Sequence, residues 1–155
     1  MNTIEIQERK KKIIAHLMDE KQTAYRRMMR DQQYDLDMAG SVGEGEEDLS
    51  ERGKIDEAIN RVEAKSQTLE DLKAQIDLLS NLDHIKATEE IQLGDVIETN
   101  KGHFFVGVPA LEFQVDGVSY RGISVDSPLY HALQGKHDGD QVEVNGHIYD
   151  LIHSY

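Results

Sequence analysis

The residues of this chain whose types could do chemistry are acids gathered between positions 44 and 51. Asp48 and Glu51 are three residues apart, a spacing that places two carboxylates on one helical turn, and Glu44, Glu46 and Glu47 precede them. Carboxylate oxygens are the ligands that hard cations such as Mg²⁺ prefer. The same spacing is typical of a helix start, where acids cap the first turn and favour the helix dipole. From these residues alone, a solvated acidic loop, a helix cap and a functional site all remain open.

Composition limits the classes of protein to consider. The 155 residues include 30 acids and 17 bases, for a formal net charge of −13. This balance argues against a surface that binds nucleic-acid phosphates as a whole. The chain has no Cys, which excludes disulfides and Cys-based zinc sites. No apolar run approaches the roughly 18 residues of a membrane span. We therefore expect a soluble, cytoplasmic protein that does not bind membranes.

Two long helices are predicted on either side of the acids. Residues 5–38 contain neither Pro nor Gly and are rich in good helix formers, and residues 49–82 repeat apolar positions in steps of three and four. The second seam comprises Ile55, Ala58, Val62, Leu69, Leu72, Ile76 and Leu79, with one polar interruption at Lys65. The first apolar face comprises Ile13, Ile14, Leu17, Met18, Ala24, Tyr25, Met28 and Met29. Because neither helix can bury its stripe alone, we expect an antiparallel coiled-coil hairpin about 50 Å long, with the acids at its tip, residues 39–52.

The remainder of the chain changes to the period of two that is typical of strands. The predicted strands are 91–98, 103–108, 111–115, 118–124, 141–144 and 147–153. A short helix over 127–134 would start at an N-cap, Asp126 or Ser127, with Pro128 in its first turn. The predicted fold class is thus α+β. A helical hairpin over residues 1–86 precedes a small antiparallel β domain with one short helix over residues 87–155.

Residues 127–144 carry a more specific pattern, S-P-L-Y-H-A-L-Q-G-K-H-D-G-D-Q-V-E-V. It resembles the C-terminal signature of the Gre family of transcript-cleavage factors (GreA and GreB), S-P-L-x-x-A-L-x-G-K-x-x-G-D-x-V-x-V. The whole chain resembles the family plan, in which a coiled-coil finger precedes an FKBP-like domain. The resemblance implies a bacterial transcription elongation factor that inserts its finger into the secondary channel of RNA polymerase. There it would stimulate cleavage at the 3′ end of backtracked nascent RNA.

The resemblance also implies roles for named residues. The family motif D-x-x-E-N matches Asp48-Leu49-Ser50-Glu51-Arg52, so Asp48 and Glu51 would be the catalytic tip carboxylates. They would hold a Mg²⁺ shared with the polymerase for metal-assisted hydrolysis. Supporting tip residues would be Glu44, Glu46, Glu47 and Arg52. The polymerase-binding surface would include Ser127, Pro128, Leu129, Gly135 and Lys136. Such a factor would be a monomer, would not be an enzyme alone, and would meet DNA only indirectly.

The tip departs from the family motif. Arg52 stands where the motif has Asn, and Gly53 weakens the first turns of the second helix by up to about 1 kcal/mol relative to Ala. Two outcomes therefore stay open. The tip carboxylates could promote cleavage, which we favour, or the finger could occlude the channel without cleavage, as inhibitory homologues of the family do.

Other features leave further alternatives. Arg26, Arg27 and Arg30 would form an RNA-contacting cluster, or ordinary surface charge paired with neighbours such as Asp31. The run of lysines at 10–12 is expected to be a solvated helix end. A peptidyl-prolyl isomerase is a second hypothesis, because the β domain resembles FKBP. A pure coiled-coil interaction module is a third.

Overall fold

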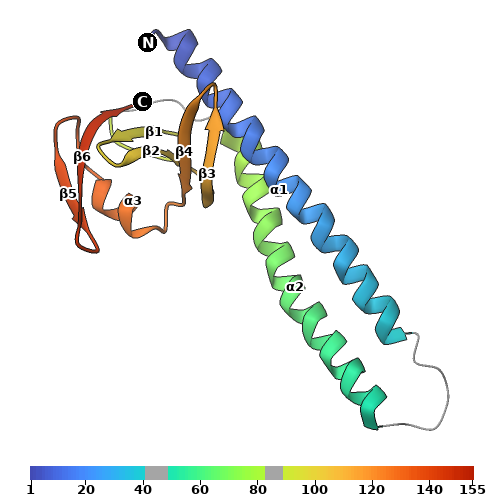
Figure 1. Cartoon of the computed structure of the whole chain (residues 1–155). Helices are drawn as coiled ribbons and strands as arrows, with labels where there is room; N and C mark the ends of the chain where they lie inside the picture. The colour runs from blue at the N-terminus through green and yellow to red at the C-terminus, as the bar shows by residue number, and fades with distance from the viewer. Residues whose placement is uncertain (41–48, 83–88) are drawn as a thin grey trace. The chain divides into compact units, whose positions relative to one another are not determined.

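The computed structural model describes residues 1–40, 49–82 and 89–155, except for the side chains of residues 39–40 and 49–51. Two long helices precede four strands, a short helix and two further strands (Figure 1), which confirms the α+β class. The chain forms two compact units. We call Met1–Met18 together with Asp77–Tyr155 the β unit, and Asp19–Ile76 the helical unit. The predicted domain boundary at 86/87 lies outside the described residues.

Both long helices lie where the sequence predicts them. Helix α1 spans Thr3–Gly40, and helix α2 spans Leu49–Asn81. Helix α1 begins with a reciprocal cap, because Asn2 Oδ1 accepts from the Glu5 amide at 2.9 Å while the Asn2 amide donates to Glu5 Oε2 at 3.0 Å. Their 38 and 33 residues correspond to about 57 and 50 Å. Within the described residues, neither is apolar enough to cross a membrane.

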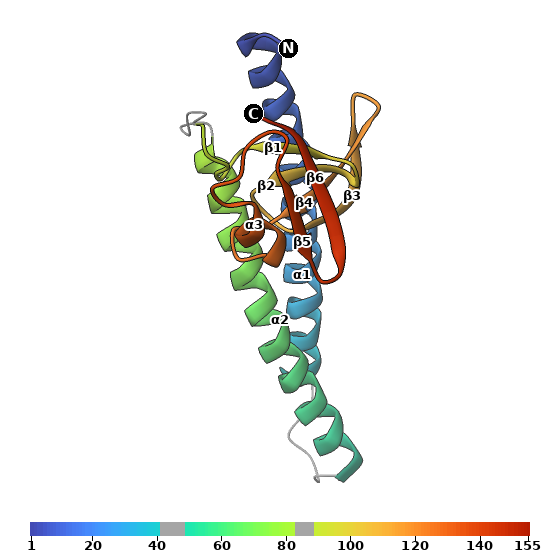
Figure 2. The same cartoon turned by 90° about the vertical axis from the view of Figure 1, so that its left-hand side faces the viewer.

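Within the helical unit the two helices lie side by side in opposite directions (Figures 1 and 2). Every predicted seam position of α2, Lys65 included, is buried or half-buried. On α1 the prediction is wrong at Met29, which is 45% exposed. The inward positions that follow on α1 are polar instead, namely half-buried Gln32 and buried Asp35. The seam therefore turns from apolar to polar along the helical unit.

The β unit contains a six-stranded sheet in the order β3-β4-β2-β1-β6-β5. The strands are β1 Val96–Thr99, β2 Gly102–Val106, β3 Ala110–Val115, β4 Val118–Ile123, β5 Gln141–Val144 and β6 His147–Ser154. The expectation of a purely antiparallel sheet is wrong, since β2 and β4 pair in parallel. The reason is that β3 occupies the sheet edge, and its hairpin partner β4 fills the place between β3 and β2.

Strand β1 begins five residues later than predicted. The Gln92 amide donates to Asp95 Oδ2 at 2.9 Å, and the Asp95 amide donates to the Gln92 carbonyl at 3.1 Å. These two bonds close a turn, which Gly94 completes with a φ of 91°. The apolar alternation of 91–95 therefore belongs to a turn that leads into the strand.

The sheet is covered on both faces, as the alternation of its strands requires. Helix α3, Pro128–Leu133, packs on one face, with Ile97, Phe104, Val106, Leu129, Leu133 and Leu151. The first part of α1 and the end of α2 pack on the other, with Ile13, Leu17, Leu79, Val96, Phe105 and Tyr120. The start of α1 is thus part of the core of the β unit.

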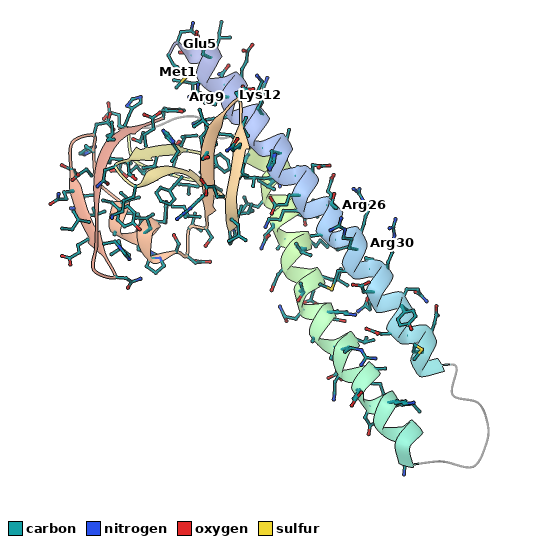
Figure 3. All side chains as sticks on the ribbon, viewed as in Figure 1. Met1, Glu5, Arg9, Lys12, Arg26 and Arg30 are labelled. Atoms are coloured by element: carbon teal, nitrogen blue, oxygen red, sulfur yellow. The ribbon has the colours of Figure 1, made fainter. Side chains whose placement is uncertain are left out.

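Polar contacts join the start of α1 to the rest of the β unit. Lys10 Nζ lies 3.4 Å from Asp95 Oδ1, and Lys12 Nζ lies 2.8 Å from Asp116 Oδ2. Arg9 donates to the Tyr155 hydroxyl at 3.4 Å; Figure 3 labels Arg9 and Lys12 on this stretch of α1. The expectation of a solvated lysine run is therefore wrong for Lys10, which is half-buried, while Lys11 and Lys12 are exposed as predicted.

Candidate functional site at the end of the helical hairpin

The predicted tip lies where the chain passes from α1 to α2. Helix α1 ends at Gly40 and α2 begins at Leu49, so Asp48 directly precedes α2 and Glu51 is its third residue. Glu44, Glu46, Glu47 and Asp48 lie outside the described residues, and so does the side chain of Glu51. Arg52, the first described side chain of α2, is exposed.

The backbone position of these acids has an electrostatic consequence. The first four amides of a helix have no partner within it, and the aligned peptide dipoles place partial positive charge there. In sequence, Asp48 directly precedes this 33-residue helix and Glu51 is its third residue. Partial positive charge at a helix start favours negatively charged groups in general, and carboxylates can bind cations. The donor set, carboxylate oxygen throughout, fits Mg²⁺.

A buried ionic cluster lies in the same helical unit. Asp35 of α1 is only 3% exposed. Its Oδ2 accepts from Lys65 Nζ at 2.6 Å and its Oδ1 from Arg61 Nε at 3.2 Å, both from α2. One turn earlier on α1, Gln32 Nε2 donates to Ser66 Oγ at 2.8 Å. These bonds join α1 and α2 in the half of the helical unit that leads to residues 41–48.

The cluster stabilises the charged form of its carboxylate. The hydrogen bond from Lys65, and after it the one from Arg61, lowers the pKa of Asp35 below its ordinary value despite burial. The sequence shows Lys65 as a polar residue in an apolar seam. An amine at such a position favours an acid on the facing helix, and this was the signal that could have pointed to Asp35.

The three arginines of the predicted cluster lie on the outside of α1. Arg26, Arg27 and Arg30 are all exposed. Figure 3 shows Arg26 and Arg30 one turn apart and pointing away from α2. Arg26 donates to Thr23 Oγ1 at 3.4 Å, and among the described residues no acid pairs with any of the three. The alternative of pairing with Asp31 therefore finds no support in the described contacts.

Arg26 also borders a groove between the two helices. The groove has a volume of about 360 Å³ and is lined by Gln22, Tyr25, Arg26, Lys73 and Ile76. Its floor contains the half-buried Tyr25 and Ile76, and its two charged residues are both cations. The two cations of the groove thus come from different helices, Arg26 from α1 and Lys73 from α2.

The predicted polymerase-binding residues lie on and after α3. Ser127 Oγ accepts from the Tyr130 amide at 3.1 Å and so caps the helix, while Leu129 is buried in the core. Pro128, Gly135 and Lys136 are exposed. Gly135 follows the helix with a φ of 71°, which favours glycine. Pro128, Gly135 and Lys136 are thus the predicted polymerase-binding residues that are exposed at the surface.

The β unit contains two described hollows. One, of about 60 Å³, adjoins Phe104 and Tyr120. The other, of about 280 Å³, is lined by residues such as Lys10, Leu93 and Asp95, with no aromatic side chain among them. A peptidyl-prolyl isomerase needs an aromatic-lined apolar pocket of ligand size, and small-molecule sites usually measure about 300–1,000 Å³. Neither hollow meets both requirements.

Comparisons with protein-family models, with curated proteins and with solved structures found no match for this chain. Among the residues that the structure describes, no group of three or more His, Asp or Glu side chains is arranged to hold a metal ion.

Proposed function

We propose that this protein is a Gre-like transcription elongation factor that stimulates cleavage of backtracked RNA by bacterial RNA polymerase. The observation that carries the proposal is that two long paired helices flank the acidic motif, with Asp48 directly before α2 in sequence and Glu51 as its third residue. An acidic end on a helical hairpin suits insertion into a channel that a globular domain could not enter. The FKBP-like character of the β domain is part of the same proposal.

The signature over residues 127–144 supports the proposal independently. Its Ser and Pro begin α3, and its first Gly follows the helix in a left-handed conformation. Its alternating end forms strand β5. The pattern therefore corresponds to one folded segment with a structural reason for most of its fixed positions.

In the proposed mechanism the chain contributes binding and orientation. Asp48 and Glu51 would hold the Mg²⁺ that the polymerase shares, and the metal would supply Lewis-acid chemistry for hydrolysis when bound. The exposed arginines of α1 would bind phosphates of the displaced RNA 3′ end. The surface around Pro128, Gly135 and Lys136 would dock on the polymerase.

The test is a cleavage assay on RNA polymerase stalled in a backtracked state, with Mg²⁺ and this protein added. The proposal expects short 3′ RNA fragments with the wild type and their loss with Asp48→Asn or Glu51→Gln. Asp56→Asn is the matched control, because Asp56 is an exposed acid of α2 outside the motif. Equal cleavage by wild type and both tip variants would refute the proposed role of the carboxylates.

The same assay separates the second candidate function. Arg52 in place of the motif Asn, together with Gly53, favours an inhibitor that occludes the channel. That function expects slower elongation by wild type and no 3′ fragments. A pure interaction module expects neither effect to depend on Asp48 or Glu51.

A further inference from the structure

The distal part of the hairpin has little apolar packing. Among the described residues of the helical unit, only three are buried, namely Ala58, Leu69 and Asp35. Ala58 contributes a single methyl group, and Leu69 lies three residues farther from the tip than Ser66. Val62 and Ser66 are only half-buried. The ionic cluster and the Gln32–Ser66 bond therefore join the two helices in a stretch where few side chains are fully buried.

We propose that Asp35 is a positioning residue, a clamp that holds the ends of α1 and α2 in one fixed arrangement and thereby orients the tip. Asp35 accepts from Lys65 through one carboxylate oxygen and from Arg61 through the other. Two such bonds fix the orientation of the carboxylate relative to α2 as well as its distance from α2. It lies five residues before the end of α1, about 8 Å along the helix. This inference rests on the proposed function for its catalytic consequence, but not for its structural one.

The loss of the clamp has a defined physical result. Without Asp35, the Arg61 side chain, already 46% exposed, can turn to water, and Lys65 at 24% exposure can follow it. Buried Ala58 and half-buried Ile55 remain on α2 in this stretch, and neither side chain can form an ionic or hydrogen-bonded link to α1. A misplacement of a catalytic group by about 1 Å can lower a rate by about 10²-fold. If the helix ends separate, we therefore expect the rate of RNA cleavage to fall more than the affinity for the polymerase.

The structural consequence can be measured by spin labelling. The chain has no Cys, so Leu36→Cys and Ile59→Cys would introduce the two thiols that carry the spin labels. Both positions are about half exposed, at 48% and 45%, and so accessible to the label. We expect a narrow distance distribution in the parent and a distribution at least twice as broad after Asp35→Asn. Asp37→Asn is the matched control, because Asp37 is exposed and, among the described residues, accepts from Gln33 of its own helix alone. Asp35→Glu, which keeps the charge, should restore at least half of the narrowing.

The functional consequence uses the unlabelled protein in the backtracked-polymerase assay. With Asp35→Asn we expect the cleavage rate at saturating protein to fall at least tenfold, while the half-saturating concentration changes less than twofold. Asp37→Asn should change neither. A circular-dichroism spectrum with unchanged helix content ensures that the variant is folded.

The outcomes are distinguishable. A narrow distribution with Asp35→Asn, equal to that with Asp37→Asn, overturns the clamp. A broad distribution with an unchanged saturating rate overturns the positioning role. If the wild type itself cleaves no RNA, the proposed function fails, and the spin-label result alone still decides whether Asp35 is a clamp.

Discussion

Replacement of Gly53 by Ala tests whether α2 is formed close to the tip. Gly53 is an exposed position of the helix, and a Cβ added there would meet no atom within 4 Å. Because Gly costs about 1 kcal/mol relative to Ala inside a helix, Gly53→Ala should stabilise the first turns of α2 by about that amount. This corresponds to a roughly fivefold lower opening equilibrium. Native-state hydrogen exchange of amides in residues 52–56 should slow by the same factor.

The matched control is the same substitution at Gly122 of strand β4. There the new Cβ would lie 2.2 Å from the Val108 carbonyl oxygen and 2.8 Å from the Ala110 nitrogen, so backbone would have to move. We expect a loss of at least about 1–3 kcal/mol of unfolding free energy, measured by urea titration. If Gly53→Ala leaves the hydrogen exchange of residues 52–56 unchanged while Gly122→Ala lowers the unfolding free energy, residue 53 does not lie within a formed helix.

Further predictions concern charges, a cap and the arginine cluster. The pKa of Asp35 is lowered, so the stability that its carboxylate contributes is present above about pH 3.9 and is lost as the pH falls through the lowered pKa. The difference in unfolding free energy between wild type and Asp35→Asn should therefore shrink on acidification. Burial raises the pKa of Asp95, so the folded state binds the proton of this carboxyl group more tightly than the unfolded state does. The unfolding free energy of wild type relative to Asp95→Asn should therefore fall as the pH rises from about 3.9 through the raised pKa. Ser127→Ala removes the cap of α3 and should lower the unfolding free energy by about 1 kcal/mol in urea titration. Arg27→Gln with Arg30→Gln should change stability by less than about 0.5 kcal/mol, since both are exposed, but should weaken RNA cleavage and its dependence on salt concentration.

Much of the fold could be predicted because local signals decide it. The periodicities of three and four in 49–82 and of two in the last third placed the helices and most strands correctly. Asp116-Gly117 and Asn145-Gly146 form turns in which both residues have positive φ, as such pairs favour. The parallel pairing of β2 with β4 could not be predicted, since it depends on which strand fills a place in the sheet rather than on either strand alone.

The candidate site could be predicted only in part. Asp48 and Glu51 follow from spacing and resemblance, and their role stays a prediction. Asp35 was missed because an acid on a polar helix gives no signal by itself; it becomes significant only opposite Lys65. Lys10 and Asp95 are similar, because their contact joins positions 85 residues apart in sequence. Such contacts form only when tertiary packing brings distant parts of the chain together, so a local sequence pattern does not predict them.

The division of the β unit into two separate stretches has a consequence for how the chain folds. Ile13 and Leu17 are synthesised early, yet they share a core with strands that follow the 58 residues of the helical unit. If those residues were a flexible loop, closing it would cost roughly 3.5 kcal/mol of chain entropy. An antiparallel hairpin that forms first, from contacts within one continuous stretch, brings residues 19 and 76 together before the sheet assembles. The hairpin would then act as a folding template for the β unit, and variants that loosen it should slow refolding of strands they never touch.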